Sequence, residues 1–153
     1  MLDFTENGYL EPFGEIETTI EVVKEHFIWN NARIELFISF ETFISELQSI
    51  IQQPFTVWLN GSFTTKKELP NDIDCVIFID FESCDKNQKA IFDLKRAFKK
   101  LKIDNYFVKV YPTGHKLHFL YELNCQEWFY NFHKTNPNKA KQKYFKGFLH
   151  IKF

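Results

Sequence analysis

The chain has 153 residues, 44% of them hydrophobic and 18% aromatic, which suits one folded domain spanning residues 1–153 and excludes an intrinsically disordered protein. Its 19 basic and 20 acidic side chains nearly cancel, so no overall charge attracts the protein to DNA, RNA or an anionic membrane. The three cysteines contain no CxxC pair and the first residues no long apolar run, which argues against a zinc site, a secretion signal and a membrane span and predicts a cytoplasmic protein.

The N-terminal part of the chain predicts an arm and two helices. Residues 1–17 are expected to form an irregular arm that packs on the domain and takes no part in its chemistry. A capping box, Thr18-x-x-Glu21, and apolar residues at helical spacing predict a short helix over 19–27. Apolar residues then recur every three or four positions from 32 to 51, which predicts a long amphipathic helix.

The stretch from residue 55 to residue 80 predicts two strands joined by a polar loop. The first apolar run ends at Gly61-Ser62, and the second opens with Asp72 and Asp74. Side chains alternate between the faces of a strand, so the two aspartates are expected to project to the same side. Neighbouring carboxylates repel each other, and a divalent cation such as Mg²⁺ or Mn²⁺ would relieve the repulsion. Glycine and serine in the turn can bring backbone N–H groups and a hydroxyl close to an anion.

The remaining residues predict two helices and two strands. Apolar residues at helical spacing between 91 and 101 predict one helix, and an aromatic-rich segment over 117–132 predicts another. Residues 104–110 predict a strand, residues 134–146 a basic loop, and the alternation over 147–153 a final strand at an edge of the sheet. The whole sequence therefore predicts an α+β fold, in which a mixed β-sheet of four to five strands is flanked by helices.

Two clusters of polar residues are assigned no site. The basic residues around the helix near 91–101 are expected to form a solvated face, and the alternative is a nucleic-acid or anion surface, whose affinity would fall steeply with salt. His115 and His118 have a spacing that could suit a metal, but no partner ligands lie near them in the sequence, so we expect surface or core histidines. The basic residues are Lys95, Arg96, Lys99, Lys100 and Lys102.

The central motif resembles that of a known superfamily. Gly61-Ser62, a nine-residue gap and Asp72-x-Asp74 followed by an apolar run are similar to the signature of the polymerase-β-like nucleotidyltransferases. More narrowly, the stretch GSFTTKKELPNDID resembles small, uncharacterised bacterial nucleotidyltransferase-like proteins of the DUF6932 type, and the similarity extends to the opening NGYL and the closing KGFLHI segments. The resemblance implies a minimal nucleotidyltransferase fold over nearly the whole chain.

The resemblance also implies a nucleoside triphosphate as substrate and Mg²⁺ or Mn²⁺ as cofactor. The phosphates would lie at the glycine-serine turn, where Lys66 or Lys67 would balance their charge. The paired aspartates would hold two metal ions, which stabilise charge on the attacking and leaving oxygens. The residues implied to bind the nucleotide are Gly61, Ser62, Thr64 and Lys66, and those implied to bind metal and to act in catalysis are Asp72, Asp74 and Asp104.

A third acid is expected on a neighbouring strand. The superfamily carries a further carboxylate there, which binds the second metal and draws the proton from the attacking hydroxyl. Asp104 is the only carboxylate of the strand predicted next along the chain, so this role falls to it. Asp80 would lie about 20 Å from Asp74, too far to share a metal, because each strand residue spans about 3.3 Å. Asp93 and Glu122 lie in helix or loop segments and rank lower.

The implied activity is transfer of an NMP group to a hydroxyl of a protein or RNA acceptor, with release of pyrophosphate. The chain is too small for the separate domains that grip a duplex, so processive synthesis on duplex DNA is not expected. The resemblance also implies a toxin–antitoxin or phage-defence system, with a cognate partner protein. Two alternatives stay open: a catalytically inactive module that binds a nucleotide or a protein, and a nucleic-acid-binding protein that uses the helical lysines and the 134–146 loop.

Overall fold

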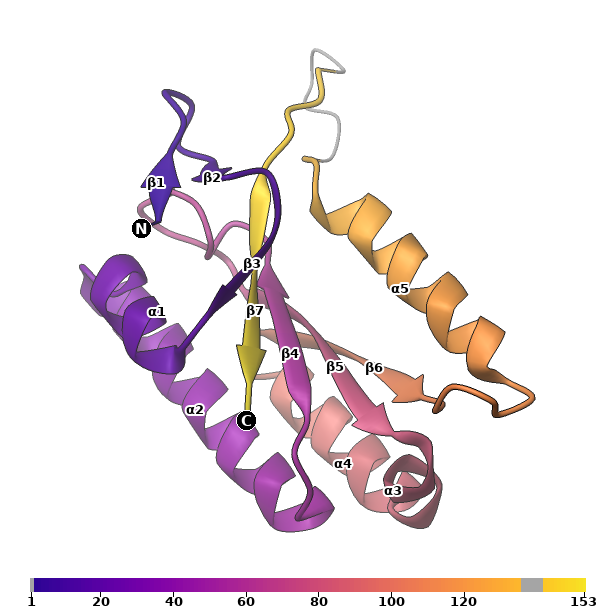
Figure 1. Cartoon of the computed structure of the whole chain (residues 1–153). Coiled ribbons are helices and arrows are strands. Elements are labelled where there is room, and N and C mark those ends of the chain that lie inside the picture. Colours follow the sequence, from indigo (N-terminus) through magenta and orange to yellow (C-terminus); the bar gives the residue numbers. More distant parts are fainter. Residues whose placement is uncertain (1, 136–141) are drawn as a thin grey trace.

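A computed structural model describes residues 2–135 and 142–153 (Figure 1). The strands of its main sheet are β3 (Gly14–Thr18), β4 (Thr56–Asn60), β5 (Ile73–Asp80), β6 (Ile103–Val110) and β7 (Gly147–Lys152), in the spatial order β3-β7-β4-β5-β6. β3 pairs with β7 in parallel and β5 with β6 in parallel, whereas β4 is antiparallel to both of its neighbours. A separate antiparallel hairpin contains β1 (Asp3–Phe4) and β2 (Leu10–Glu11).

The helices lie on both faces of this sheet. They are α1 (Ile20–Phe27), α2 (Asn31–Ile51), α3 (Phe81–Lys86), α4 (Gln88–Lys99) and α5 (His118–Phe132). Figure 1 shows α1, α2 and α4 together on one face, while α5 crosses the other face alone. The predicted α+β fold with a mixed sheet is thereby confirmed. Across the described ranges 2–135 and 142–153, no helix combines the length and the apolar character that a bilayer crossing requires.

Strand alternation divides the apolar side chains of the sheet between two clusters. The larger cluster joins one face to α1, α2 and α4, and the smaller joins the other face to α5. Neighbouring residues of β4 illustrate the division, because Val57 and Leu59 belong to the larger cluster and Trp58 to the smaller. The buried members of the smaller cluster are Trp58, Val76, Phe78, Val108, Phe132 and Phe148.

The predicted arm over residues 1–17 is wrong in structure. The segment forms the β1–β2 hairpin and then β3, an edge strand of the main sheet. β3 pairs in parallel with β7, the last strand in the chain. The partner lies more than a hundred residues away, so local sequence patterns carry no sign of the pairing. The final strand was expected at an edge, and this is also wrong, because β3 covers its outer side and makes β7 an interior strand.

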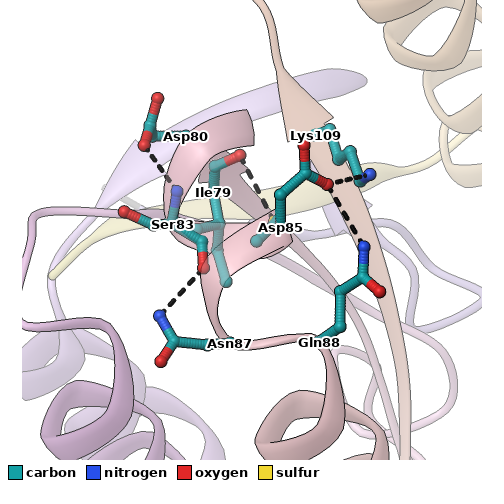
Figure 2. Close-up of polar contacts among 8 residues, drawn as sticks. Ile79, Asp80, Ser83, Asp85, Asn87, Gln88 and Lys109 are labelled. Atoms are coloured by element: carbon teal, nitrogen blue, oxygen red, sulfur yellow. Dashed lines mark hydrogen bonds and ion pairs between the residues drawn. The ribbon is translucent and has the colours of Figure 1, made fainter.

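Two helix boundaries differ from the prediction for local reasons. The N-cap of α1 is Thr19 rather than Thr18, and its side chain makes no capping hydrogen bond, so the predicted capping box is wrong. The polar stretch that follows β5 contains a short helix, α3. Figure 2 shows the Asp80 carboxylate accepting a hydrogen bond from the backbone N–H of Ser83 at 2.9 Å. Asp80 is therefore the N-cap of α3.

Side-chain contacts join the C-terminal end of β6 to α3. Figure 2 shows Lys109 of β6 donating to the Asp85 carboxylate, which also accepts from Gln88. The ammonium of Lys109 lowers the pKa of Asp85. These contacts are structural, and they lie at the end of the sheet opposite the candidate site. Residues 136–141 of the predicted basic loop lie outside the described residues.

Candidate active site

Three polar side chains form a row across one end of the main sheet. Asn60 of β4 pairs with Asp74 of β5, and Asp74 pairs with Asp104 of β6. Paired residues on neighbouring strands project to the same face. That face is the one that α5 covers, because Trp58 and Val76, two positions along β4 and β5, pack against α5. The proposed third acid thus lies beside Asp74.

The other two acids of the motif have different surroundings. Asp72 lies directly before β5 and is half-buried, so the predicted second strand begins one residue later than expected. Asp104 is also half-buried, and its Oδ2 accepts a hydrogen bond from the Tyr106 hydroxyl at 2.9 Å. The Lys99 ammonium lies 3.7 Å from the other oxygen, Oδ1. Oδ1 of Asp104 therefore has only this long ion-pair contact, whereas Oδ2 is hydrogen-bonded.

The turn after β4 requires a glycine. Gly61 has a φ of +81°, which L side chains rarely adopt, and it packs directly against the Asp74 carboxylate. A Cβ at this position would lie 1.9 Å from Oδ2 of Asp74. The turn is thus in contact with the Asp74 carboxylate. Because Gly61 has no side chain, Ser62 carries the first side chain of the loop.

Replacement of Gly61 by alanine is expected to destabilise the fold by about 2–3 kcal/mol, through backbone strain and the collision with Asp74. Urea unfolding would measure the loss. Gly114→Ala is the matched control, because Gly114 has a φ of +89° with no neighbouring atom within 4 Å, and it should cost only about 1 kcal/mol. Adding Asp74→Ala to Gly61→Ala should recover part of the loss. Equal losses for the two glycines would contradict the contact with Asp74.

A buried arginine fixes the loop that follows the turn. The Arg33 guanidinium is fully buried and donates to the backbone carbonyl oxygens of Phe63, Thr65 and Lys67 at 2.6–2.7 Å, and to that of Phe27 at 3.1 Å. Burial lowers the pKa of Arg33 to about 10, so the group stays charged at neutral pH. The sequence prediction missed this role, although Arg33 precedes the apolar positions of α2 by the three and four residues that share its buried face.

Two threonines complete the loop from within. The Thr64 hydroxyl donates to the carbonyl oxygen of Gly61 at 3.2 Å, and the Thr65 hydroxyl donates to that of Ser62 at 2.7 Å. Thr64 is fully buried and is not among the residues that line the neighbouring cavity. Its hydroxyl therefore shapes the glycine-serine turn from behind.

A cavity of about 970 Å³ opens in front of the turn and Asp74. Four lysines and two carboxylates are among the residues that line it, so the excess charge is positive and suits an anion. Its walls come from the β4–β5 loop, the β1–β2 hairpin and the end of α5. The charged lining residues are Glu6, Lys66, Lys67, Asp74, Lys134 and Lys146.

The N-terminal hairpin forms one wall of this cavity. Residues 1–17 were expected to take no part in the chemistry, and the structure places residues 4–9 of this segment in the lining of the cavity. Gly8 accepts a hydrogen bond from the backbone N–H of Lys66 at 2.9 Å, and the Lys66 ammonium lies 4.3 Å from the centroid of the Phe4 ring. The hairpin thus positions one of the lysines predicted to face phosphate.

One family model covers almost the whole chain. It is described as a family of unknown function (DUF6932) and matches residues 2–152. The chain belongs to this family. No curated protein and no solved structure matches it. The DUF6932 match includes both the N-terminal hairpin and β7, so every wall of the cavity lies within the span of the family.

A buried lysine lies close to Asp74 in this DUF6932 protein. Lys146, directly before β7, is only 5% exposed and lines the cavity. Burial lowers its pKa to about 8, against the opposing attraction of Asp74. Its backbone N–H donates to the carbonyl oxygen of His133, and its carbonyl accepts from the N–H of Gly14. The sequence prediction placed Lys146 in the basic loop over 134–146. It missed the burial of this residue, because burial of a single lysine leaves no local pattern in the sequence.

Asp74 has the most perturbed carboxyl of the row. Burial and, to a smaller extent, the charges of Asp72 and Asp104 raise its pKa to about 6, while Lys146 acts in the opposite sense. The three acids are thus close enough to repel one another, as the sequence predicted for the first two. At neutral pH the DUF6932 protein holds concentrated negative charge at this end of the sheet.

The donor chemistry of the acids fits a divalent cation, since hard carboxylate oxygens are what Mg²⁺ and Mn²⁺ prefer. Within the part of the chain that the structure describes, no group of three or more His, Cys, Asp or Glu side chains is already arranged around a common metal position. Mg²⁺ commonly takes only one or two carboxylates and fills its remaining positions with water and substrate phosphates. The three aspartates, Asp72, Asp74 and Asp104, therefore suit a metal ion that enters the site bound to a phosphate.

The histidines that the sequence set aside have local partners. His118 Nδ1 hydrogen-bonds the carbonyl oxygen of Tyr111 at 2.7 Å, and His115 Nδ1 accepts from the backbone N–H of Leu117 at 3.0 Å. The rings of His115 and Tyr111 also stack, with centroids 4.9 Å apart. These contacts organise the connection between β6 and α5.

Proposed function

We propose that this protein is a metal-dependent nucleotidyltransferase, which moves an NMP group from a nucleoside triphosphate to a hydroxyl of a protein or RNA acceptor and releases pyrophosphate. The observation that carries the proposal is the contact between the Gly61 turn and Asp74, whose neighbour in register is Asp104. The glycine-serine turn, which could bind an anion, and Asp74, which could bind a metal, then border one lysine-lined cavity. The likeness of the central motif to polymerase-β-like nucleotidyltransferases supports the same assignment.

The chain supplies binding groups on both sides of the triphosphate. Ser62, Lys66 and Lys146 balance the charge of its phosphates, and the exposed ammonium of Lys66 is positioned by the hairpin. Asp72, Asp74 and Asp104 are the residues that would hold Mg²⁺, which when bound stabilises charge on the attacking and leaving oxygens.

Asp104 also takes the proton of the acceptor hydroxyl. The Tyr106 hydroxyl occupies Oδ2 and fixes the orientation of the carboxylate, so Oδ1 is the oxygen available to the acceptor. The hydroxyl, once deprotonated, attacks the α-phosphorus, and pyrophosphate leaves toward Lys66 and Lys146.

The acceptor class, the partner and the cellular setting belong to the same proposal. We place the reaction in the cytoplasm, in a toxin–antitoxin or phage-defence pair with a cognate partner protein. The free thiols of Cys75, Cys84 and Cys125 are compatible with a reducing compartment.

Calorimetric titration with each of the four ribonucleoside triphosphates tests the proposal, with MgCl₂ and with EDTA. We expect binding of at least one triphosphate that strengthens with Mg²⁺. Incubation of α-labelled triphosphate with total bacterial RNA and with total protein should then release pyrophosphate and label one acceptor class. Absence of Mg²⁺-dependent binding for all four triphosphates would refute the assignment.

The Lys146→Met variant is expected to bind the triphosphate about 10- to 100-fold more weakly, because a charge-assisted hydrogen bond to phosphate is lost. The methionine keeps the apolar stem of the buried side chain. Calorimetry on the folded variant measures the change. Lys152→Met, at the exposed far end of β7, serves as the control and should bind like the wild type. If the wild type, Lys146→Met and Lys152→Met bind the triphosphate with equal affinity, Lys146 does not contact the phosphates.

A catalytically inactive nucleotide-binding module is the second candidate. The observation that favours it is that Asp74 lines the cavity, whereas Asp72 and Asp104 are not among its lining residues. Triphosphate binding without pyrophosphate release, in the presence of every acceptor tested, would select this module over the transferase.

A further inference from the structure

A cluster of basic side chains lies beside the acids of the candidate site. Residues 95–102, which end α4 and lead into β6, include five basic and no acidic side chains. The backbone N–H of Ile73 donates to the carbonyl oxygen of Lys102 at 3.0 Å, so the segment reaches the residue next to Asp72. Asp104 follows two positions after Lys102. We define the basic cluster as Lys95, Arg96, Lys99, Lys100 and Lys102.

Two lysines of the basic cluster reach Asp104 from the other face of the sheet. α4 and α5 lie on opposite faces (Figure 1), Asp104 projects toward α5, and β6 is an edge strand. The Lys99 ammonium extends to within 3.7 Å of Oδ1 of Asp104. The Lys95 ammonium lies 5.3 Å from the centroid of the Tyr106 ring, whose hydroxyl binds Oδ2. Both lysines therefore pass around the outer edge of β6 to the proposed base.

The charge of the basic cluster is largely unpaired. Within residues 2–135 and 142–153, Asp104 is the only carboxylate that forms an ion pair with a member of the cluster. Lys100 and Lys102 are exposed and have no such partner in these ranges. Positive charge is thus concentrated here, although the whole chain has a net charge of −1, and such a surface attracts a polyanion.

The surface of α4 adds an exposed aromatic ring to this charge. Phe92, Arg96 and Lys99 are separated by four and three residues, so they share one side of the helix. Phe92 is 57% exposed, and the Arg96 guanidinium lies 5.6 Å from the centroid of its ring. Unpaired bases stack on exposed aromatic rings and on guanidinium planes. The combination of ring and charge favours single-stranded nucleic acid over a peptide.

We propose that the basic cluster binds the phosphate backbone of single-stranded RNA, and that a hydroxyl of this RNA is the acceptor of the transfer. RNA has a 2′-hydroxyl on each nucleotide, so a phosphate bound by Lys99 brings a hydroxyl close to Oδ1 of Asp104. A protein hydroxyl has no phosphates beside it and gains nothing from the cluster. The choice of acceptor rests on the proposed transferase activity, whereas RNA binding by the cluster does not.

The transfer to RNA balances without any further reactant. The RNA hydroxyl gives its proton to Asp104, and its oxygen forms a bond to the α-phosphorus of the triphosphate. The bond from this phosphorus to the oxygen that bridges to the β-phosphate breaks, and pyrophosphate leaves with the bonding electron pair.

Fluorescence anisotropy of the full chain with a labelled single-stranded RNA of about 20 nucleotides, without triphosphate, tests the surface. We expect a Kd below about 10 μM at low salt. The logarithm of Kd should rise with that of the salt concentration with a slope of about 2–3, because each phosphate contact contributes about 0.7.

A double variant, Lys100→Gln with Lys102→Gln, should weaken RNA binding about tenfold and reduce the salt slope by about 1. Lys86→Gln with Lys89→Gln is the matched control, because these lysines are equally exposed but lie at the other end of α4, and it should bind RNA like the wild type. All four side chains are exposed, so urea unfolding of both variants should match that of the wild type. In the pyrophosphate-release assay, the KM for RNA should rise about tenfold in the first variant alone.

The outcomes separate this inference from the transferase assignment. The RNA surface is overturned if the wild type binds no RNA, if its binding is independent of salt, or if both double variants bind like the wild type. Labelling of protein but not RNA overturns the choice of acceptor and leaves the transferase intact. RNA binding that depends on the basic cluster, without Mg²⁺-dependent binding of any triphosphate, supports the RNA surface and refutes the transferase.

Discussion

The Asp74→Asn variant is expected to lose magnesium-dependent nucleotidyl transfer by about a thousandfold or more, because a metal ligand contributes several kcal/mol of transition-state stabilisation. Asparagine keeps the shape that packs against Gly61 but cannot carry the charge. Pyrophosphate release under saturating triphosphate measures the loss. Asp93→Asn, an exposed acid on α4, is the control and should retain full activity. Undiminished turnover in Asp74→Asn would contradict the mechanism.

The same variant should be more stable than the wild type when metal is absent. The pKa of Asp74 is about 6 in the folded state against an ordinary value of 3.8, so folding favours its protonated form. The resulting penalty is absent below about pH 4, grows as pH rises, and is complete above about pH 6. The rise corresponds to about 3 kcal/mol, and solvent near the half-buried carboxyl reduces the expected gain to about 1–2 kcal/mol.

Urea unfolding in EDTA from pH 4 to pH 8 measures this difference. The curves of wild type and Asp74→Asn should converge near pH 4, separate as pH rises, and reach their full separation above about pH 6. Added Mg²⁺ and triphosphate should then stabilise the wild type more than the variant, because binding to the folded state raises stability. A variant that is less stable at pH 7.5 would indicate that Asp74 supports the fold.

Arg33→Met is expected to have the largest effect on stability, a loss of about 3–5 kcal/mol. The substitution leaves the backbone carbonyl oxygen of Phe27, and those of three residues in the loop over 63–67, without the buried donor that they share. Arg33→Lys should not rescue the loss, because an ammonium cannot match the planar fork of donors. Urea unfolding measures both variants.

Arg96→Met on the surface of α4 is the matched control and should change stability by less than about 0.5 kcal/mol. Where Arg33→Met remains folded, at low temperature, its triphosphate affinity should also fall, since the loop that carries Lys66 is no longer fixed. If Arg33→Met is destabilised but binds the triphosphate with normal affinity, Arg33 supports the fold and does not contribute to the binding site.

The sequence predicted those parts of the fold that have local periodic patterns. Apolar spacing defined α2 from residue 32, one residue from its observed start, and the apolar run after Asp72 defined β5. The glycine before Ser62 also marked a real turn, because its positive φ is a local property. The likeness of the chain to the DUF6932 family is confirmed over residues 2–152, and the superfamily assignment stays a prediction.

The parts that were missed depend on contacts between distant segments. Glu15 and Glu17 alternate with Ile16 over only five residues, too few to reveal a strand whose partner is β7. Lys146 lies beside Asp74 because it directly precedes β7, and the N-terminal hairpin is held at the cavity by its contacts with the 63–67 loop and with Tyr144. None of these positions could be inferred before the strand order was known.

The parallel pairing of the first long strand with the last determines when the site can form during synthesis. β3 has no neighbour in the sheet other than β7, and Lys146 precedes β7 directly. β3 therefore stays unpaired, and the lysine absent, until β7 has been synthesised and has left the exit tunnel. A chain with this topology cannot complete the cavity co-translationally before that point, because the pairing joins segments that are far apart in the sequence.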